Sequence, residues 1–139
     1  MRSLKWLLAL VLVFGLGACA TEGGHQTSAL ERAQYAWTAA IRWGDTAGAW
    51  KQLDPDYRAR HALTDLEISR YKLVEVTGYT VLDSTTLGPE DFERAVEITV
   101  VNKRDMSARN VGYTERWHYD AANKAWWVTS GLPNYWEGR

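Results

Sequence analysis

Val111-Gly-Tyr-Thr-Glu-Arg-Trp-His-Tyr119 is the stretch that decides the fold, because apolar and polar side chains alternate along it. Such alternation is typical of a β-strand with one buried face. One predicted face carries Val111, Tyr113, Glu115, Trp117 and Tyr119, and the other carries Thr114, Arg116, His118 and Asp120. Asp120-Ala-Ala-Asn-Lys124 then has the composition of a hairpin turn, so we expect residues 125–130 to return as the last strand.

Two further strands are predicted upstream of this hairpin. Residues 71–82 are rich in branched and aromatic side chains, as strands usually are. Gly78 within them suggests a bulge or a sharp bend. Residues 92–101 alternate, with Val96, Ile98 and Val100 on one face.

The segment before the strands is predicted to be helical. Ser28-Ala-Leu-Glu31 has the form of a helix capping box, and apolar residues follow at helical spacing, which predicts a helix over 29–43. Trp43-Gly44-Asp45 should end this helix, because glycine allows a left-handed stop and Asp45 can cap the next helix. A short helix is predicted over 46–53. The composition permits a third helix over 55–62 and another turn opening at 64–67. Helices followed by antiparallel strands indicate an α+β class, with N-terminal helices packed on a bent antiparallel sheet of about four strands.

The N-terminus has the pattern of an export signal. Arg2 and Lys5 precede an apolar run from Trp6 to Phe14, which is shorter than the roughly 20 residues of a membrane-spanning helix. Leu16-Gly17-Ala18-Cys19 then resembles the lipobox of bacterial lipoproteins. That resemblance implies that residues 1–18 are a signal peptide and that Cys19 carries the lipid, palmitate included, after cleavage. Because Ala20 rather than aspartate follows, it also implies an outer-membrane anchor that faces the periplasm.

Residues 19–27 are predicted to be the lipidated cysteine and a flexible tether, and residues 28–139 a single domain. Loss of the signal would remove two of the 16 basic residues and none of the 17 acidic ones, so the net charge falls from −1 to about −3. This charge argues against nucleic acid as a partner. Cys19 is the only cysteine, so the domain forms no internal disulfide.

The order of the predicted elements resembles the nuclear-transport-factor-2-like superfamily, also called the cystatin-like α+β cone. The residues behind this are Trp43-Gly44-Asp45, Leu53-Asp54-Pro55 and the ending Trp126-Trp-Val-Thr-Ser-Gly-Leu-Pro133, within residues 28–133. The resemblance implies a strongly bent sheet wrapped around a long helix, with a cavity at the open end. The superfamily hosts enzymes, binding modules and assembly domains, so it does not decide the activity.

Glu115 is the candidate catalytic residue, because it shares a face with Tyr113 and Trp117 and is expected to be partly buried. A carboxylate in an apolar pocket can act as a general base. Glu75 is a similar case on the first strand. The alternative is that Glu115 pairs with an arginine or lies in water at the sheet edge.

The remaining polar candidates do not form a recognisable site. His118 is expected on the solvent face beside Arg116, and His61 has no second ligand at a metal-binding spacing. No nucleophile motif and no phosphate-binding glycine loop occurs. We therefore predict no metal and no cofactor.

The tryptophans divide into a predicted core group and a predicted surface group. Trp37, Trp50, Trp117 and Trp127 are expected in the core, although some could line a ligand cavity. Trp126 alternates with Trp127 and Trp136 follows the last strand, so these two are expected to be exposed. Exposed tryptophans are enriched at interfaces, which makes them candidate interaction residues.

These patterns favour a membrane-anchored cell-envelope lipoprotein whose domain is non-enzymatic and binds an envelope protein or a small apolar ligand. The alternative is a small cone-type lyase or isomerase that acts on an apolar substrate, with Glu115 as its base. A third possibility is a homodimer joined through the outer face of the sheet.

Overall fold

The computed structural model describes residues 17–136, with side chains described from residue 23 onward. The chain divides into two compact units, Met1–Arg32 and Ala33–Arg139. In the first unit, the described residues 17–32 are helical. Within the described residues we find no helix that is both long enough and apolar enough to span a membrane. Most of the predicted signal peptide (residues 1–16) lies outside the described residues, and so does the side chain of Cys19.

The helix α2 spans Gly17–Arg42, so it begins well before the predicted start at residue 29. The capping-box pattern at Ser28 is therefore wrong as a helix start. It lies inside a segment that lacks proline, and the hydroxyl of Thr27 bonds to the carbonyl of Gly23 at 3.0 Å within the helix. Residues 19–27 are thus helical here, and their role as a tether stays a prediction.

The end of α2 confirms the predicted stop. Gly44 has φ +69°, a left-handed conformation that glycine adopts without a steric penalty. The amide of Gly44 bonds to the carbonyl of Ile41 at 3.2 Å, and the amide of Asp45 bonds to the carbonyl of Ala40 at 2.9 Å. These two bonds form a Schellman ending, which satisfies carbonyls that the helix leaves free.

Three short helices follow: α3 (Thr46–Lys51), α4 (Pro55–Arg60) and α5 (Asp65–Tyr71). Each begins with a side-chain cap. Asp45 accepts from the amide of Gly48 and Asp54 accepts from the amide of Tyr57. Thr64 and Glu67 form a full capping box at α5. Such caps satisfy backbone donors that the first helical turn leaves unpaired.

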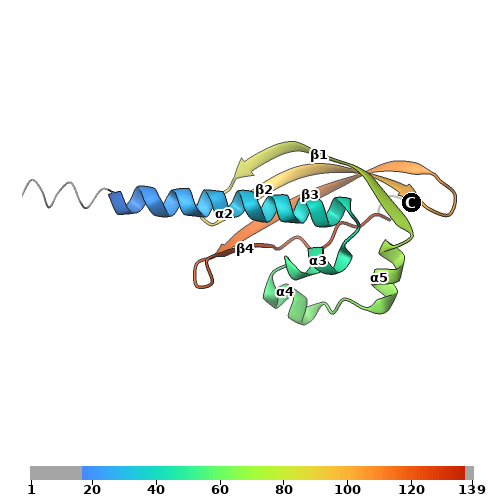
Figure 1. Cartoon of the computed structure of the whole chain (residues 1–139), viewed down its shortest axis with the longest axis horizontal. Helices are drawn as coiled ribbons and strands as arrows, with labels where there is room; N and C mark the ends of the chain where they lie inside the picture. The colour runs from blue at the N-terminus through green and yellow to red at the C-terminus, as the bar shows by residue number, and fades with distance from the viewer. Residues whose placement is uncertain (1–16, 137–139) are drawn as a thin grey trace, which may run out of the picture. The chain divides into compact units, whose positions relative to one another are not determined.

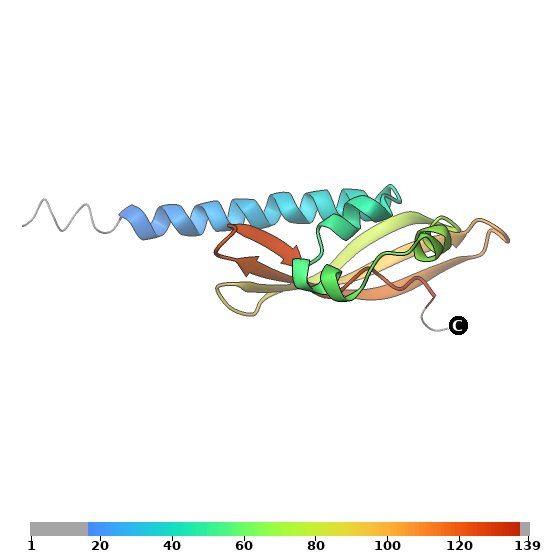
Figure 2. The same ribbon diagram turned by 90° about the horizontal axis from the view of Figure 1, so that it is seen from below.

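The sheet contains four antiparallel strands in the order β1-β2-β3-β4 (Figures 1 and 2). They are β1 (Val74–Thr86), β2 (Asp91–Asn102), β3 (Ala108–Asp120) and β4 (Ala125–Val128). The predicted α+β class and the predicted sheet of about four strands are confirmed. The edge strand β4 meets the segment between α3 and α4, because Leu53 forms a parallel bridge with Val128.

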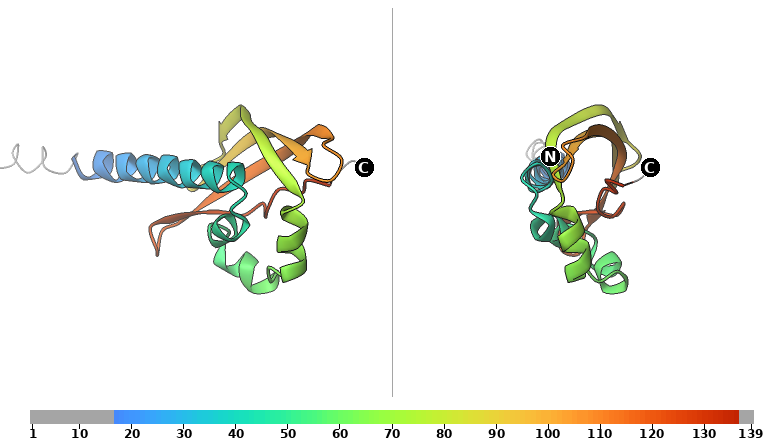
Figure 3. Two further views of the ribbon diagram at one scale, coloured as in Figure 1. Left: turned by 45° about the vertical axis from the view of Figure 1, so that its right-hand side comes forward. Right: turned by 90° about the vertical axis from the view of Figure 1, so that its right-hand side faces the viewer.

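The sheet curves strongly, as the right-hand view of Figure 3 shows. The pairing of β1 with β2 shifts between Val76 and Gly78 and again between Val81 and Asp83. Each shift is a bulge, and bulges bend a strand and increase its twist. The irregularity predicted at Gly78 is therefore present.

Residues 33–42 of α2 pack against the inner face of the sheet. Trp37 is fully buried, and its ring lies 6.4 Å from Tyr113 and 6.3 Å from Trp117. The predicted inner residues of β2, namely Val96, Ile98 and Val100, are all buried. The core therefore lies between this helix and the concave side of the sheet.

The prediction for β4 is wrong about which tryptophan faces inward. Trp126 is only 8 % exposed, whereas Trp127 is half-buried. Trp126 lies opposite Tyr119 in the register, with the two rings 5.2 Å apart, and Val128 shares its face and is also buried. Because Trp126, Trp127 and Val128 are all apolar, alternation alone cannot tell which of them faces the core.

Candidate functional site

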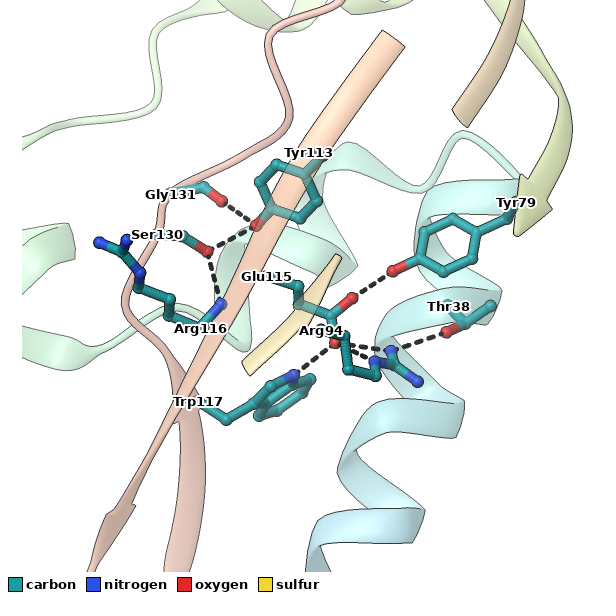
Figure 4. Close-up of polar contacts among 9 residues, drawn as sticks. All are labelled: Thr38, Tyr79, Arg94, Tyr113, Glu115, Arg116, Trp117, Ser130 and Gly131. Atoms are coloured by element: carbon teal, nitrogen blue, oxygen red, sulfur yellow. Dashed lines mark hydrogen bonds and ion pairs between the residues drawn. The ribbon is translucent and has the colours of Figure 1, made fainter. Parts of the chain in front are cut away.

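Glu115 lies at the centre of β3 and is completely buried. Its neighbour across the sheet is Arg94 of β2, whose Nε donates to Oε1 of Glu115 at 2.8 Å while Nη2 lies 2.5 Å from the same oxygen. The indole of Trp117 also donates to Oε1, and the hydroxyl of Tyr79 donates to Oε2. Figure 4 shows these groups converging on the carboxylate, which has a partner at both oxygens.

Arg94 connects this group to the helix, because its Nη2 donates to the hydroxyl of Thr38 at 3.4 Å. The resulting Glu115 cluster (Thr38, Tyr79, Arg94, Glu115 and Trp117) joins α2, β1, β2 and β3 (Figure 4). Burial, with the adjacent Glu115 charge, raises the pKa of Tyr79 well above its usual range, so this hydroxyl stays protonated and donates. A buried charge needs such a full set of partners, since an unpaired one is very costly.

The chemistry of this arrangement is that of an ion pair. A general base needs an accessible lone pair directed at a substrate. Glu115 has no exposed surface and contacts an arginine, so the alternative in which it pairs with an arginine describes it well. Glu75, the other candidate carboxylate, is exposed on β1, and the expectation that it is partly buried is wrong.

One cavity beside the C-terminal part of α2 is small. The cavity there measures ≈ 20 Å³ and is lined mainly by small and apolar side chains such as Ala40, Ile41, Ala49 and Val76. A single water needs roughly 10–15 Å³ by this kind of measure. This cavity therefore has room for about one water and none for an apolar substrate.

Trp136 lies in an open region, beyond the last strand. Its ring lies 5.2 Å from Tyr71 and 5.9 Å from Tyr135, and the guanidinium of Arg70 lies 4.6 Å from its centroid. Figure 1 shows α5, which carries Arg70 and Tyr71, near the segment that follows β4. We call the cleft there, of ≈ 280 Å³, the Trp136 cleft; its lining residues are Glu67, Arg70, Tyr71, Asn134 and Trp136.

A second cleft, of ≈ 130 Å³, also includes Trp136 and is lined by Leu73, Val74, Asn102, Arg104 and Trp136. We call it the Arg104 cleft. Tyr71 links α5 to the segment after β4, since its hydroxyl donates to the carbonyl of Pro133 at 2.9 Å. Burial raises the pKa of Tyr71 to about 12.

The two histidines considered as candidates, His118 and His61, each contact a neighbouring side chain. His118 lies on the outer face as predicted and contacts the carboxylate of Asp91 at 2.9 Å. His61 stacks on Tyr57 with 4.2 Å between ring centroids. Among residues 23–136, whose side chains the structure describes, we find no group of three His, Cys, Asp or Glu side chains able to hold a metal ion.

Sequence reasoning missed three residues that matter. Arg94 has the same strand parity as Val96, Ile98 and Val100, so the alternation of β2 contained the signal that it points inward. Tyr79 follows a bulge that shifts its parity, which hides its orientation. Arg70 contacts Trp136 only because distant parts of the chain meet, and no local pattern indicates this contact.

Comparison with known proteins gives a distant structural relative. No known protein family and no curated protein sequence matches the chain. A similar solved structure is the solution structure of a SEC-C motif containing protein from Rhodopseudomonas palustris. The TM-score is 0.55 at 13 % sequence identity, over 70 % of this chain and 72 % of that one. At this identity the likeness concerns the fold alone.

Proposed function

We propose that this protein is a membrane-anchored cell-envelope lipoprotein whose folded domain binds a ligand or partner and catalyses no reaction. The anchor is supported by Leu16-Gly17-Ala18-Cys19, which places a lone cysteine directly after an apolar run and small residues. The palmitate-bearing Cys19 then holds the domain at the outer membrane on its periplasmic side. We also propose that the domain is a nuclear-transport-factor-2-like cone, which its element order and curved sheet support.

The observation that carries the binding role is the state of Glu115. This residue is the best candidate base in the sequence, yet it is fully buried and held by Arg94, Tyr79 and Trp117. Charged, amide and aromatic side chains instead line an open cleft elsewhere, the Trp136 cleft. Trp136 is one of the two tryptophans predicted from the sequence to contact a partner, and the half-buried ring is available there. Trp126, the other one, is buried and no longer supports that role.

Metabolic labelling tests the anchor. Cells that express the full chain are given labelled palmitate and then fractionated, beside cells that express Cys19→Ala. We expect label and membrane association in the wild type and the loss of both in Cys19→Ala. A matched control is Thr21→Ala, which changes a nearby side chain and should keep the label.

Two results would contradict the proposed anchor. One is a wild-type protein that is unlabelled and found in the soluble fraction. The other is a Cys19→Ala variant that still carries palmitate, because the chain has no second cysteine whose thiol could take the diacylglycerol.

A further inference from the structure

We propose that the Trp136 cleft is a binding site for an organic carboxylate, with Arg70 as its charge partner and the ring of Trp136 as its apolar wall. This inference rests on the binding role proposed above and names the ligand chemistry. It does not depend on lipidation of Cys19.

Arginines supply the positive charge of the two clefts. Arg70 and Arg104 each line one of the two clefts that share Trp136. Neither arginine makes an ion pair with another described residue. The only acid of the Trp136 cleft is Glu67, and one of its oxygens already accepts bonds from the amide and hydroxyl of Thr64 at 2.9 and 2.8 Å. Arg70 is thus the one cationic side chain that lines this cleft, and it interacts electrostatically with Glu67, the one acid there.

Asparagine side chains add hydrogen-bond donors to both clefts. The side-chain oxygen of Asn134 accepts from the amide of Trp136 at 3.0 Å, and that of Asn102 accepts from the amide of Arg104 at 2.8 Å. In each of these carboxamides the oxygen is used in this bond, and the NH₂ group can donate hydrogen bonds to a ligand. Together with the guanidinium groups, these groups make both clefts rich in donors. A carboxylate accepts only, so it matches them, whereas a neutral sugar brings hydroxyl donors that need acceptors.

The orientation of Arg70 and the size of the Trp136 cleft suit a small carboxylate group. The guanidinium of Arg70 lies over the ring of Trp136, which leaves its edge free to donate two parallel bonds to a carboxylate. A volume of ≈ 280 Å³ is at the lower limit of ordinary ligand pockets, so the cleft accommodates an end group rather than a large molecule. An acyl amino acid with a free carboxylate, which represents the end of a peptide, has the required size and chemistry.

Nuclear magnetic resonance of the full chain in neutral detergent tests this proposal. The indole signal of Trp136 is assigned by its loss in Trp136→Phe. We expect this signal to shift on titration with N-acetylphenylalanine and to stay in place with N-acetylphenylalaninamide, which lacks the charge. Arg70→Gln should lower the affinity for the acid by about tenfold or more. Arg60→Gln, a change at an exposed arginine of α4, should leave this affinity unchanged.

Several results would overturn the proposal. They are equal shifts with acid and amide, a stronger shift with galactose than with the acid, an unchanged affinity in Arg70→Gln, and no shift with any probe. If Arg70→Gln loses the dispersed spectrum of the folded domain, Asn134→Asp takes its place. That change keeps the oxygen that accepts from Trp136 and adds a repelling charge, so it should abolish binding of the acid. If the protein is labelled and membrane-bound but fails this titration, the proposed anchor stands and only the proposed carboxylate site is contradicted.

Discussion

Two arginine–glutamate pairs lie at adjacent positions across β2 and β3, and they occupy opposite faces of the sheet. Arg94 is opposite Glu115, and Glu93 is opposite Arg116. The side chains of the inner pair are 10 % and 0 % exposed, whereas those of the outer pair, Arg116 and Glu93, are 63 % and 31 % exposed. The two pairs have the same chemistry and similar local backbone, so their difference isolates the effect of burial.

The comparison shows why the acid that is most conspicuous in the sequence has a structural role. The inner carboxylate has been removed from water and needs Arg94, Trp117 and Tyr79 to compensate. The outer pair keeps its hydration and gains little from the contact. Burial thus converts an ordinary ion pair into a connection between the helix and three strands.

Removal of the inner cation is the change with the largest expected effect. Arg94→Met should lower the free energy of unfolding by about 3–5 kcal/mol, because it leaves the carboxylate of Glu115 buried without its counter-charge. Chemical denaturation followed by tryptophan fluorescence measures this loss.

A second substitution distinguishes the cause. Glu115→Leu in the Arg94→Met background removes the unpaired charge and should restore much of the stability, since a buried pair can often be replaced by apolar side chains. Two results would contradict this account of the buried pair. One is a loss of unfolding free energy below about 1 kcal/mol in Arg94→Met, and the other is a double variant that is no more stable than the single one.

The next largest effect concerns the tyrosines that are buried in the folded protein. Burial raises the pKa of Tyr79 above its usual range and that of Tyr71 to about 12. Below pH 10 both hydroxyls are protonated in the folded and unfolded chain. Above it the unfolded chain loses protons that the folded chain keeps, so stability falls with rising pH by about 1.4 kcal/mol per pH unit for each such tyrosine. The contribution of Tyr71 to this slope ends near pH 12, where its hydroxyl also ionises in the folded chain.

Unfolding measured between pH 9 and 12 tests this slope. Tyr79→Phe should make it shallower by the share of one tyrosine, whatever the substitution does to stability at neutral pH. Tyr35→Phe is the matched control, because that side chain is 80 % exposed and should leave the slope unchanged. A slope that Tyr79→Phe does not alter would mean that this hydroxyl ionises equally in both states.

Much of the inner face of the sheet was predictable from sequence, because strand alternation reports orientation directly. The alternation of β3 placed Glu115, Trp117 and Tyr113 together and put His118 on the other face. It does not report which residue of the next strand lies opposite, so the partner of Glu115 required the register of β2 with β3. Where both faces are apolar, as at Trp126 and Trp127, the same reasoning fails.

Local sequence patterns could not predict the start of α2 or the Trp136 cleft, and the reasons differ. A capping-box signature indicates a helix start only if the preceding residues leave the helix, and here they remain helical. The cleft forms where α5 meets the segment after β4, so its residues Arg70 and Trp136 become neighbours only through the tertiary fold. Trp136 itself was recognisable as a candidate because it follows the last strand.

The smallest expected effect concerns the outer pair, and it separates the two faces by their response to salt. Arg116→Met should change the free energy of unfolding by less than about 1 kcal/mol, because both partners are hydrated. At 1 M salt the screening length falls to roughly 3 Å, so even this difference should disappear. The loss in Arg94→Met should persist, since a pair without access to water is screened much less. Denaturation of the wild type and both variants at 0.1 M and 1 M sodium chloride makes the comparison. If salt reduced both losses equally, water and ions would reach Glu115, and the contrast between a buried connection and a surface contact would have to be given up.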